Sequence, residues 1–369
     1  MNVPLVDLKW QHAEIADEVR SGLDAVMANT AFIHGPQVAE FEQAFAAFCD
    51  VRNCVGVASG TDALEMAVRG LGLEAGDEVI VPANSFIAST LGVIRAGAGV
   101  KLVDCDPDTY LIDVDAVDQA MSPKVKAVMP VHLFGQTAPV EELSAIVGDA
   151  AIIEDAAQSQ GARRNGKLAG SLGRIAATSF YPGKNIGAYG DAGGVLTDDD
   201  ELAQHVRNLG NWGSPEKYHH PVIGFNSRLD TMQAVVLSAK LARLAAWNKL
   251  RQEAADRYTE LLQARGQVLP PVVLPGNEHI WHLYVVRVAE RDRVMSAMHD
   301  DGIGAGVHYP IPMHLQGALS FMGHRAGDFP ATEAAAREML SLPMFPGITA
   351  EQQELVVDSL HRALDSASV

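Results

Sequence analysis

Between residues 53 and 200, short runs of apolar, often β-branched residues alternate with segments whose apolar positions recur every three or four residues. The runs predict strands at 54–58, 77–82, 99–106, 124–132, 150–156 and 175–180, with helices at 61–71 and 85–97. Strands that are apolar throughout and separated by helices are typical of a mostly parallel sheet covered on both faces. We therefore predict an α/β domain, with ligands expected at the carboxyl ends of its strands.

The pattern changes after Asn226. Apolar residues at spacings of three and four continue from Leu237 to Leu261, which predicts one amphipathic helix of roughly 30 residues, about 45 Å long. A Pro/Gly-rich loop at 268–277, a strand at 281–288 and helices at 291–302 and 350–367 follow. This arrangement predicts a large α/β domain at 1–245 and a smaller α+β domain at 246–369.

Three strand ends carry candidate chemistry. Ser59-Gly60-Thr61-Asp62 lies between a strand and a helix, where exposed backbone N–H groups favour a phosphate, although an ordinary helix cap has the same sequence. Asp155 ends a buried strand, and its neighbour Glu154 points to the opposite face. Such an acid requires a cation or a protonated nitrogen as partner, unless it only caps a helix.

The segment Ser179-Phe-Tyr-Pro-Gly-Lys184-Asn185 places a lysine directly after another strand. The P-loop motif does not fit, because Thr178 and Asn185 occupy its glycine and Ser/Thr positions. A desolvated lysine at this edge can form a Schiff base, whereas a solvated loop lysine has no such chemistry. Taken together, lysine, carboxylate and anion cradle match what pyridoxal phosphate requires.

Composition narrows the class further. The 369 residues contain 28 Lys+Arg and 46 Asp+Glu, a net charge of −18, which argues against a nucleic acid partner because an acidic surface repels the phosphate backbone. Three cysteines without CxxC spacing argue against disulfides and against a structural zinc site, and no metal is expected. No export signal or membrane-spanning segment is visible in the sequence, so we expect a cytoplasmic protein without a membrane partner.

These residues resemble the sugar aminotransferases of the DegT/DnrJ/EryC1/StrS family, enzymes with the aspartate aminotransferase fold (fold type I) that use pyridoxal phosphate. The resemblance covers nearly the whole chain and rests on VPLVDL (3–8), ASGTDAL (58–64), DEVIVPANSFIAS (77–89), VHLFGQ (131–136), IEDAAQSQGA (153–162), SFYPGKNIGAYGDAGG (179–194), GFNSRLDTMQA (224–234) and HYPIPMHLQ (308–316). It implies roles for individual residues. Lys184 would form the Schiff base, Asp155 would contact the pyridine nitrogen and Gln158 the side of the ring that carries the phenolic oxygen. Phe86 would stack on the ring, and Gly60, Thr61 and Ser179 would hold the phosphate.

The resemblance also implies a homodimer with shared active sites, because Asn226 matches an asparagine that reaches the phosphate from the other subunit. The segments around His308-Tyr309 and Lys217-Tyr218-His219-His220 resemble enzymes that aminate C-3 of a dTDP-linked 3-keto-6-deoxyhexose with L-glutamate as donor. Basic residues cluster at Lys217, His220 and Arg228, which would suit the binding of an anionic sugar nucleotide. The same cluster is also compatible with an ordinary solvated loop. Arg228 is also a candidate for binding the carboxylate of the donor.

Three other functions stay open at this point. The chain could act at C-4 or on a UDP-linked keto-sugar within the same family. It could be a pyridoxal-phosphate lyase or dehydratase, which the presence of Lys184 disfavours. It could also be a regulatory protein that binds the cofactor without catalysis.

Overall fold

A computed structural model describes residues 2–366. Its centre is a seven-stranded sheet in the order β1-β9-β8-β5-β4-β2-β3. The strands are β1 (Asn53–Val57), β9 (Gly193–Thr197), β8 (Ile175–Ser179), β5 (Ala151–Asp155), β4 (Val125–Val128), β2 (Glu78–Pro82) and β3 (Gly99–Val103). β9 is antiparallel to both of its neighbours, and the other pairs are parallel. The predicted mostly parallel sheet is thus confirmed.

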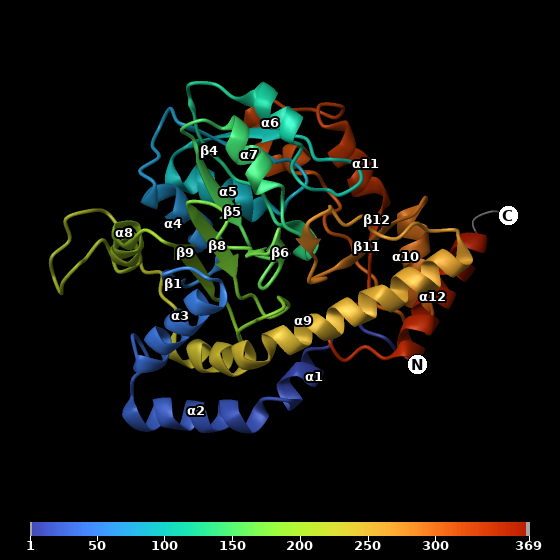
Figure 1. The fold of residues 1–369 in the computed structure, drawn as a ribbon, viewed down its shortest axis with the longest axis horizontal. Coiled ribbons are helices and arrows are strands. Elements are labelled where there is room, and N and C mark those ends of the chain that lie inside the picture. Colours follow the sequence, from blue (N-terminus) through green and yellow to red (C-terminus); the bar gives the residue numbers. More distant parts are fainter. Residues whose placement is uncertain (1, 367–369) are drawn as a thin grey trace.

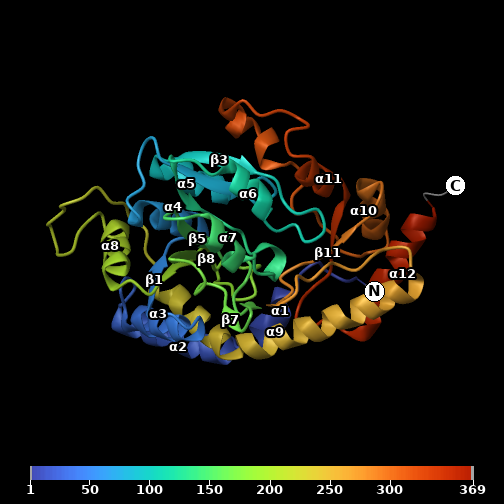
Figure 2. The ribbon, with the colours of Figure 1, turned by 45° about the horizontal axis from the view of Figure 1, so that its top comes forward.

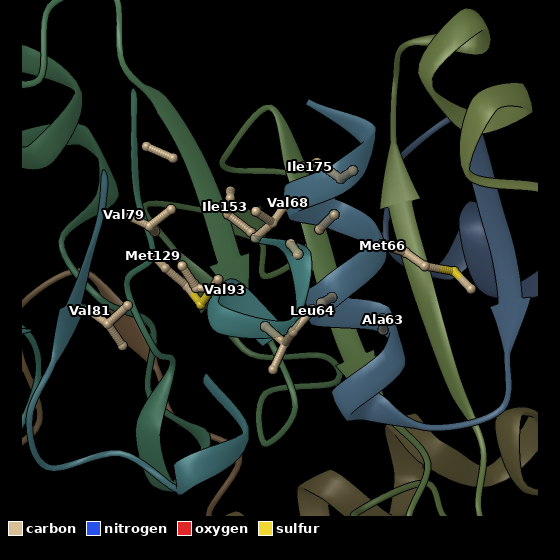
Figure 3. Close-up of a cluster of buried hydrophobic side chains, with 14 of the residues drawn as sticks. Ala63, Leu64, Met66, Val68, Val79, Val81, Val93, Met129, Ile153 and Ile175 are labelled. Carbon is tan, nitrogen blue, oxygen red and sulfur yellow. The ribbon is translucent and has the colours of Figure 1, made fainter. Parts of the chain in front are cut away.

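Helices cover both faces of this sheet (Figure 1). On one face, α4 (Gly60–Gly70), α5 (Ile87–Ala96) and α8 (Asp200–Gly210) form a single apolar cluster with the strands. Figure 3 shows part of it, with Val68 of α4 near Ile153 of β5 and Ile175 of β8. The opposite face packs against α3 (Pro36–Phe48), α6 (Val114–Ala120) and α7 (Val140–Ile146). Two apolar faces explain why the strands read as continuous apolar runs.

The long helix predicted after Asn226 is α9 (Thr231–Arg265), 35 residues long. Figures 1 and 2 show it in yellow, running from beside α2 (Ala16–Asn29) and α3 to α12 (Ala350–Asp365). Its first half packs in the cluster that contains α3, and its second half packs in the C-terminal core. The predicted helix at 350–367 corresponds to α12, and residue 367 lies outside the described residues.

The C-terminal core is built on a two-stranded antiparallel sheet of β11 (Tyr284–Arg287) and β12 (Met339–Leu342), with α10 (Arg291–Asp300) and α12 packed against it. The predicted strand at 281–288 is shorter in the structure, because Trp281 has a positive φ of 51° and the chain is irregular before Tyr284. α11 (Pro330–Glu338) packs instead in the apolar cluster that contains α6 and α7, to which Ala335 belongs.

The N-terminal segment also joins the C-terminal core. The Val3 backbone pairs with Gly302 and Gly304, and the Met344 N–H donates to the Leu5 carbonyl. The boundary at residue 245 falls inside α9 and stays a prediction. The remaining elements are α1 (Leu8–Ala13), β6 (Arg163–Arg164), β7 (Lys167–Leu168), β10 (Asn277–Glu278) and the 3₁₀ helices η1 (Leu133–Gly135), η2 (Met313–Leu315) and η3 (Gly317–Met322). None of the helices in 2–366 is long and apolar enough to cross a membrane.

Candidate active site

A cavity of about 570 Å³ opens at the carboxyl ends of the parallel strands. Nine of the predicted site residues line it: Gly60, Thr61, Phe86, Asp155, Gln158, Ser179, Lys184, His308 and Tyr309. They come from segments that are far apart in the sequence, including the ends of β5 and β8, the start of α4 and the segment before η2. The topology therefore brings together most of the residues that the sequence singled out.

Asp155 is the last residue of β5 and is buried. Its Oδ2 accepts a hydrogen bond from Ser89 Oγ at 2.7 Å, and its Oδ1 accepts one from the Ala157 N–H at 3.2 Å. Burial raises the pKa of this carboxyl, an effect that these hydrogen bonds and Lys184 oppose. Within residues 2–366 the carboxylate forms no ion pair, so it can bind a cationic group that enters the cavity.

Glu154 points to the opposite face, as predicted from strand alternation. Its carboxylate accepts hydrogen bonds of 2.7 Å from the N–H groups of Gly170, Leu172 and Gly173, and it contacts His132 Nε2 at 2.8 Å. The partners of the Glu154 carboxylate are thus three backbone N–H groups and one side chain of the protein. Glu154 therefore holds the 170–173 turn to the sheet, and Asp155 is the acid that faces the ligand.

Lys184 lies in the turn between β8 and β9, where its N–H donates to the Tyr181 carbonyl at 2.8 Å. Burial lowers the pKa of its amine to about 8, while the Asp155 carboxylate acts in the opposite direction. With that pKa, about a tenth of the amine is neutral at pH 7, far more than for an ordinary lysine. Lys184 is thus prepared to react with a carbonyl carbon.

The start of α4 provides the predicted anion cradle. Ser59 caps the helix by accepting a hydrogen bond from the Asp62 N–H, which leaves the N–H groups of Gly60 and Thr61 without an intrahelical partner. A Cβ on Gly60 would lie 2.6 Å from the Ser179 Cβ, so only glycine lets α4 approach β8 this closely. The exposed N–H groups and the Thr61 and Ser179 hydroxyls suit a phosphate.

Aromatic side chains form another part of the wall. The ring centroids of Phe86 and Tyr309 lie 5.3 Å apart. The Phe86 side chain is 52% exposed, so it is not part of the hydrophobic core. Gln158 links two segments here. Its Oε1 accepts from the Phe134 N–H at 2.6 Å and its Nε2 donates to the Tyr309 hydroxyl at 3.1 Å.

Five predicted residues do not line the cavity of the single chain: Asn226, Lys217, Tyr218, His220 and Arg228. They belong to a segment after α8 that projects from the body as a long loop (Figure 1). Asn226 is exposed, and Arg228 stacks on the Trp212 ring, with its guanidinium carbon 4.5 Å from the ring centroid. Whether these residues reach a site therefore depends on what covers the loop.

Several other residues line or support the cavity without having been predicted from the sequence. Ser89 lies four residues after Ser85 and hydrogen-bonds it at 2.7 Å, a pair that the ANSFIAS segment contains without marking it as functional. Leu5 and Val6 arrive from the N-terminal segment, and His282 from the chain just before β11. No local pattern distinguishes His282 from a core histidine, because it reaches the cavity through the tertiary fold.

The cavity fits the cofactor that the sequence suggested. A desolvated lysine, a buried carboxylate that forms no ion pair within residues 2–366 and the start of a helix face one cavity. These are the groups that the aldehyde, the ring nitrogen and the phosphate of pyridoxal phosphate need.

Comparison with known proteins supports the interpretation of the cavity as a pyridoxal phosphate site. The model of the DegT/DnrJ/EryC1/StrS aminotransferase family matches residues 13–361. A pleiotropic regulatory protein of Geobacillus stearothermophilus is 43% identical, with 98% of each chain covered. The dTDP-3-amino-3,4,6-trideoxy-alpha-D-glucose transaminase of Streptomyces venezuelae is 41% identical, with 97% of this chain and 95% of that enzyme covered. The crystal structure of S. venezuelae DesV in complex with a ketimine intermediate has a TM-score of 0.95 at 41% identity, with 98% of each chain covered.

The match over nearly the full length, the shared fold and the fitted cavity lead to one conclusion. This chain belongs to the DegT/DnrJ/EryC1/StrS aminotransferase family, whose enzymes depend on pyridoxal phosphate.

Proposed function

We propose that the enzyme moves the amino group of L-glutamate to C-3 of a dTDP-linked 3-keto-6-deoxyhexose in the biosynthesis of an amino sugar. The observation that carries the proposal is the presence of the desolvated Lys184 amine and the buried Asp155 carboxylate in one cavity. The transaminase activity of the 41% identical Streptomyces venezuelae relative supports the choice of a dTDP-sugar with nitrogen at C-3.

When bound, pyridoxal phosphate supplies an electron sink that stabilises negative charge on the carbon next to the amine. Lys184 is the residue that would bind the cofactor aldehyde covalently and, once released, would move the proton at the α-carbon of the donor. Asp155 keeps the ring nitrogen protonated, because a buried carboxylate favours a cation beside it. The N–H groups of Gly60 and Thr61, with the Ser179 hydroxyl, bind the phosphate.

The proposal includes a homodimer in which the loop after α8 completes the site of the partner subunit. Its apolar side chains are unusually exposed for a monomer, with Ile223 at 94% and Tyr218 at 85% exposure. In the dimer, Asn226 would contact the cofactor phosphate, while Lys217, Tyr218, His220 and Arg228 would face the sugar nucleotide. His308 and Tyr309 would approach the same sugar from within the chain.

Replacing Lys184 tests the cofactor assignment. Lys184→Ala should abolish the visible absorbance of the covalently held cofactor and reduce turnover to the background rate, because no other amine of the cavity can replace it. Lys249→Ala, an exposed lysine on α9, is the matched control and should behave like wild type. A Lys184→Ala enzyme that keeps both the absorbance and turnover contradicts the proposal.

Substrate choice is tested by assaying four keto-sugars side by side, the 3-keto and 4-keto forms linked to dTDP and to UDP. The dTDP-linked 3-keto sugar should give the highest kcat/KM. A preference for a 4-keto or a UDP-linked sugar would leave the aminotransferase assignment intact and replace the substrate. Failure of glutamate to convert the cofactor to its amino form would instead favour a lyase, a dehydratase or a non-catalytic regulator.

A further inference from the structure

His282 lines the same cavity as Lys184 and belongs to no motif that the function has used so far. Its Nδ1 lies 3.2 Å from the Oδ1 of Asn185, the residue that follows the lysine. His282 is buried, and in the part of the chain that the structure describes its Nε2 forms no hydrogen bond. What this nitrogen can do depends on whether it carries a proton.

A series of hydrogen-bonded side-chain amides next to the ring determines which nitrogen of His282 carries the proton. The Gln160 backbone carbonyl can only accept a hydrogen bond, so the Asn248 Nδ2 must donate to it, at 2.9 Å. The Asn248 Oδ1 therefore faces Asn185. Asn185 in turn donates its Nδ2 to Asn248 Oδ1 at 2.9 Å and to the Ile280 carbonyl at 3.2 Å.

Two backbone carbonyls thus fix both amides, and the Asn185 oxygen must face His282. Because that oxygen can only accept, the His282 Nδ1 must carry the proton and donate it. In the neutral ring, Nε2 then holds a lone pair and no proton.

The ring is also held neutral. Burial keeps the pKa of His282 well below its usual range, and the groups that face it lower that pKa further. These groups are Lys184, Arg251, His308 and His279, all of them cationic or capable of becoming so. A ring held neutral in this way keeps the lone pair of Nε2 available to accept a hydrogen bond.

Lys184 is the complementary group. Its amine is desolvated, it lowers the pKa of His282 more than any of the other three charged groups does, and no hydrogen bond of its Nζ is formed among residues 2–366. Within the described residues, the Lys184 ammonium therefore has no acceptor and the His282 Nε2 lone pair has no donor, and both side chains line the same cavity.

We propose that His282 is a positioning residue for Lys184, whose ε-ammonium donates a hydrogen bond to His282 Nε2 whenever the amine is not covalently bound. This rests on the proposed role of Lys184. The contact would hold the released lysine near the reacting carbons and would favour its charged form, in which it has a proton to give.

The His282 Nε2 acceptor would raise the pKa of the Lys184 amine. A hydrogen bond accepted from the ammonium stabilises the charged form and raises the pKa of Lys184, so removal of the acceptor should lower that pKa. A decrease of one pKa unit increases the neutral fraction, and with it the reactivity of the amine, about tenfold at a pH below both values.

The test measures carbamylation of Lys184 by cyanate in the full-length protein freed of cofactor, with peptide mass spectrometry across pH 6–10. His282→Leu should react up to about tenfold faster than wild type at pH 6.5. His282→Gln, whose amide oxygen can accept the same hydrogen bond, should lie close to wild type, and His361→Leu, a buried histidine of α12, should match it. Equal rates for His282→Leu and wild type, or no rescue by His282→Gln, would overturn the proposal.

A second measurement needs no substitution at the site. In wild-type protein labelled with ¹⁵N-histidine, the His282 resonances, assigned by their loss in His282→Gln, should show a protonated Nδ1 and an unprotonated Nε2. A protonated Nε2 would refute the inferred hydrogen bond even if His282→Leu failed to fold. Neither measurement involves turnover, so failure here is distinct from failure of Lys184→Ala to lose the bound cofactor.

Discussion

At the scale of single residues, the Asp155 carboxylate depends on Ser89 behind it. The Ser89 hydroxyl donates to Oδ2 and is itself 2.7 Å from Ser85 Oγ, so two serines orient one acid. This bond favours the ionised form of Asp155 against the burial that raises its pKa.

Ser89→Ala should therefore raise the pKa of Asp155 and weaken its hold on a protonated ring nitrogen. A hydrogen bond to a charged group contributes about 1.5–3 kcal/mol, so we expect the rate of the glutamate half-reaction to fall roughly ten- to hundredfold at neutral pH. Ser85→Ala, which keeps the bond between Ser89 and Asp155, is the control and should lose much less. Equal losses in the two variants would show that the cavity wall as a whole matters and that the bond to Asp155 does not.

The pKa of Lys184 predicts how capture of the cofactor depends on pH. Only the neutral amine attacks an aldehyde, and burial lowers its pKa to about 8. The capture rate should rise about tenfold per pH unit below 8 and level off above it. Stopped-flow absorbance measures this rate, with a free lysine derivative as reference for the titration of the cofactor itself. A rate that continues to rise to pH 10 would mean that the amine is not desolvated.

At the scale of elements, the contact between α4 and β8 shapes the anion cradle. Gly60→Ala should push the two apart, because the added Cβ would lie 2.6 Å from the Ser179 Cβ. We expect the Kd for pyridoxal phosphate to rise about tenfold or more, since a loss of about 1.4 kcal/mol suffices for that factor. Gly317→Ala, where a Cβ meets open space, is the matched control. Unchanged affinity in Gly60→Ala would place the phosphate elsewhere.

The elements differ in how far the sequence could predict them. The parallel strands were predictable because burial on both faces makes them continuous apolar runs. β9 was not predicted, since two of its five residues are glycines, which weaken the strand signal. Most predicted ends were off by a few residues. For example, the run at 99–106 gives a strand that stops at Val103, where the chain turns away from the sheet.

At the scale of the whole molecule, a net charge of −18 opposes the approach of a sugar nucleotide. Lys217 lies in the segment between α8 and α9, with its Nζ 5.1 Å from the centroid of the Tyr218 ring, and no ion pair of this lysine is formed within residues 2–366. Lys217→Ala should raise the KM for the sugar nucleotide about threefold or more and leave the KM for glutamate nearly unchanged. Lys249→Ala controls for the loss of one positive charge. Equal changes in the two KM values would rule out a role in binding the nucleotide.

The sequence pattern predicted site residues where chemistry follows a strand, and the family resemblance predicted others, such as Phe86 and Tyr309. Asp155 and Lys184 were found in the first way, because the carboxyl ends of neighbouring strands meet at one edge. His282 and Ser89 carry no such mark. They reach the cavity through contacts between segments more than sixty residues apart, such as Ser89 with Asp155 and His282 with Asn185. Periodicity cannot report contacts of this kind.

The single helix α9 also constrains how the lengths of related chains can vary. One residue added within its 35 would rotate everything beyond it by about 100° and move it by about 1.5 Å. Asn248 and Arg251 would then lose their partners at Asn185 and at the carbonyls of Trp281 and Met344. Natural insertions should therefore spare α9 and collect in loops such as 268–276. Hybrid enzymes that exchange C-terminal domains should be joined inside this helix without any change in residue count.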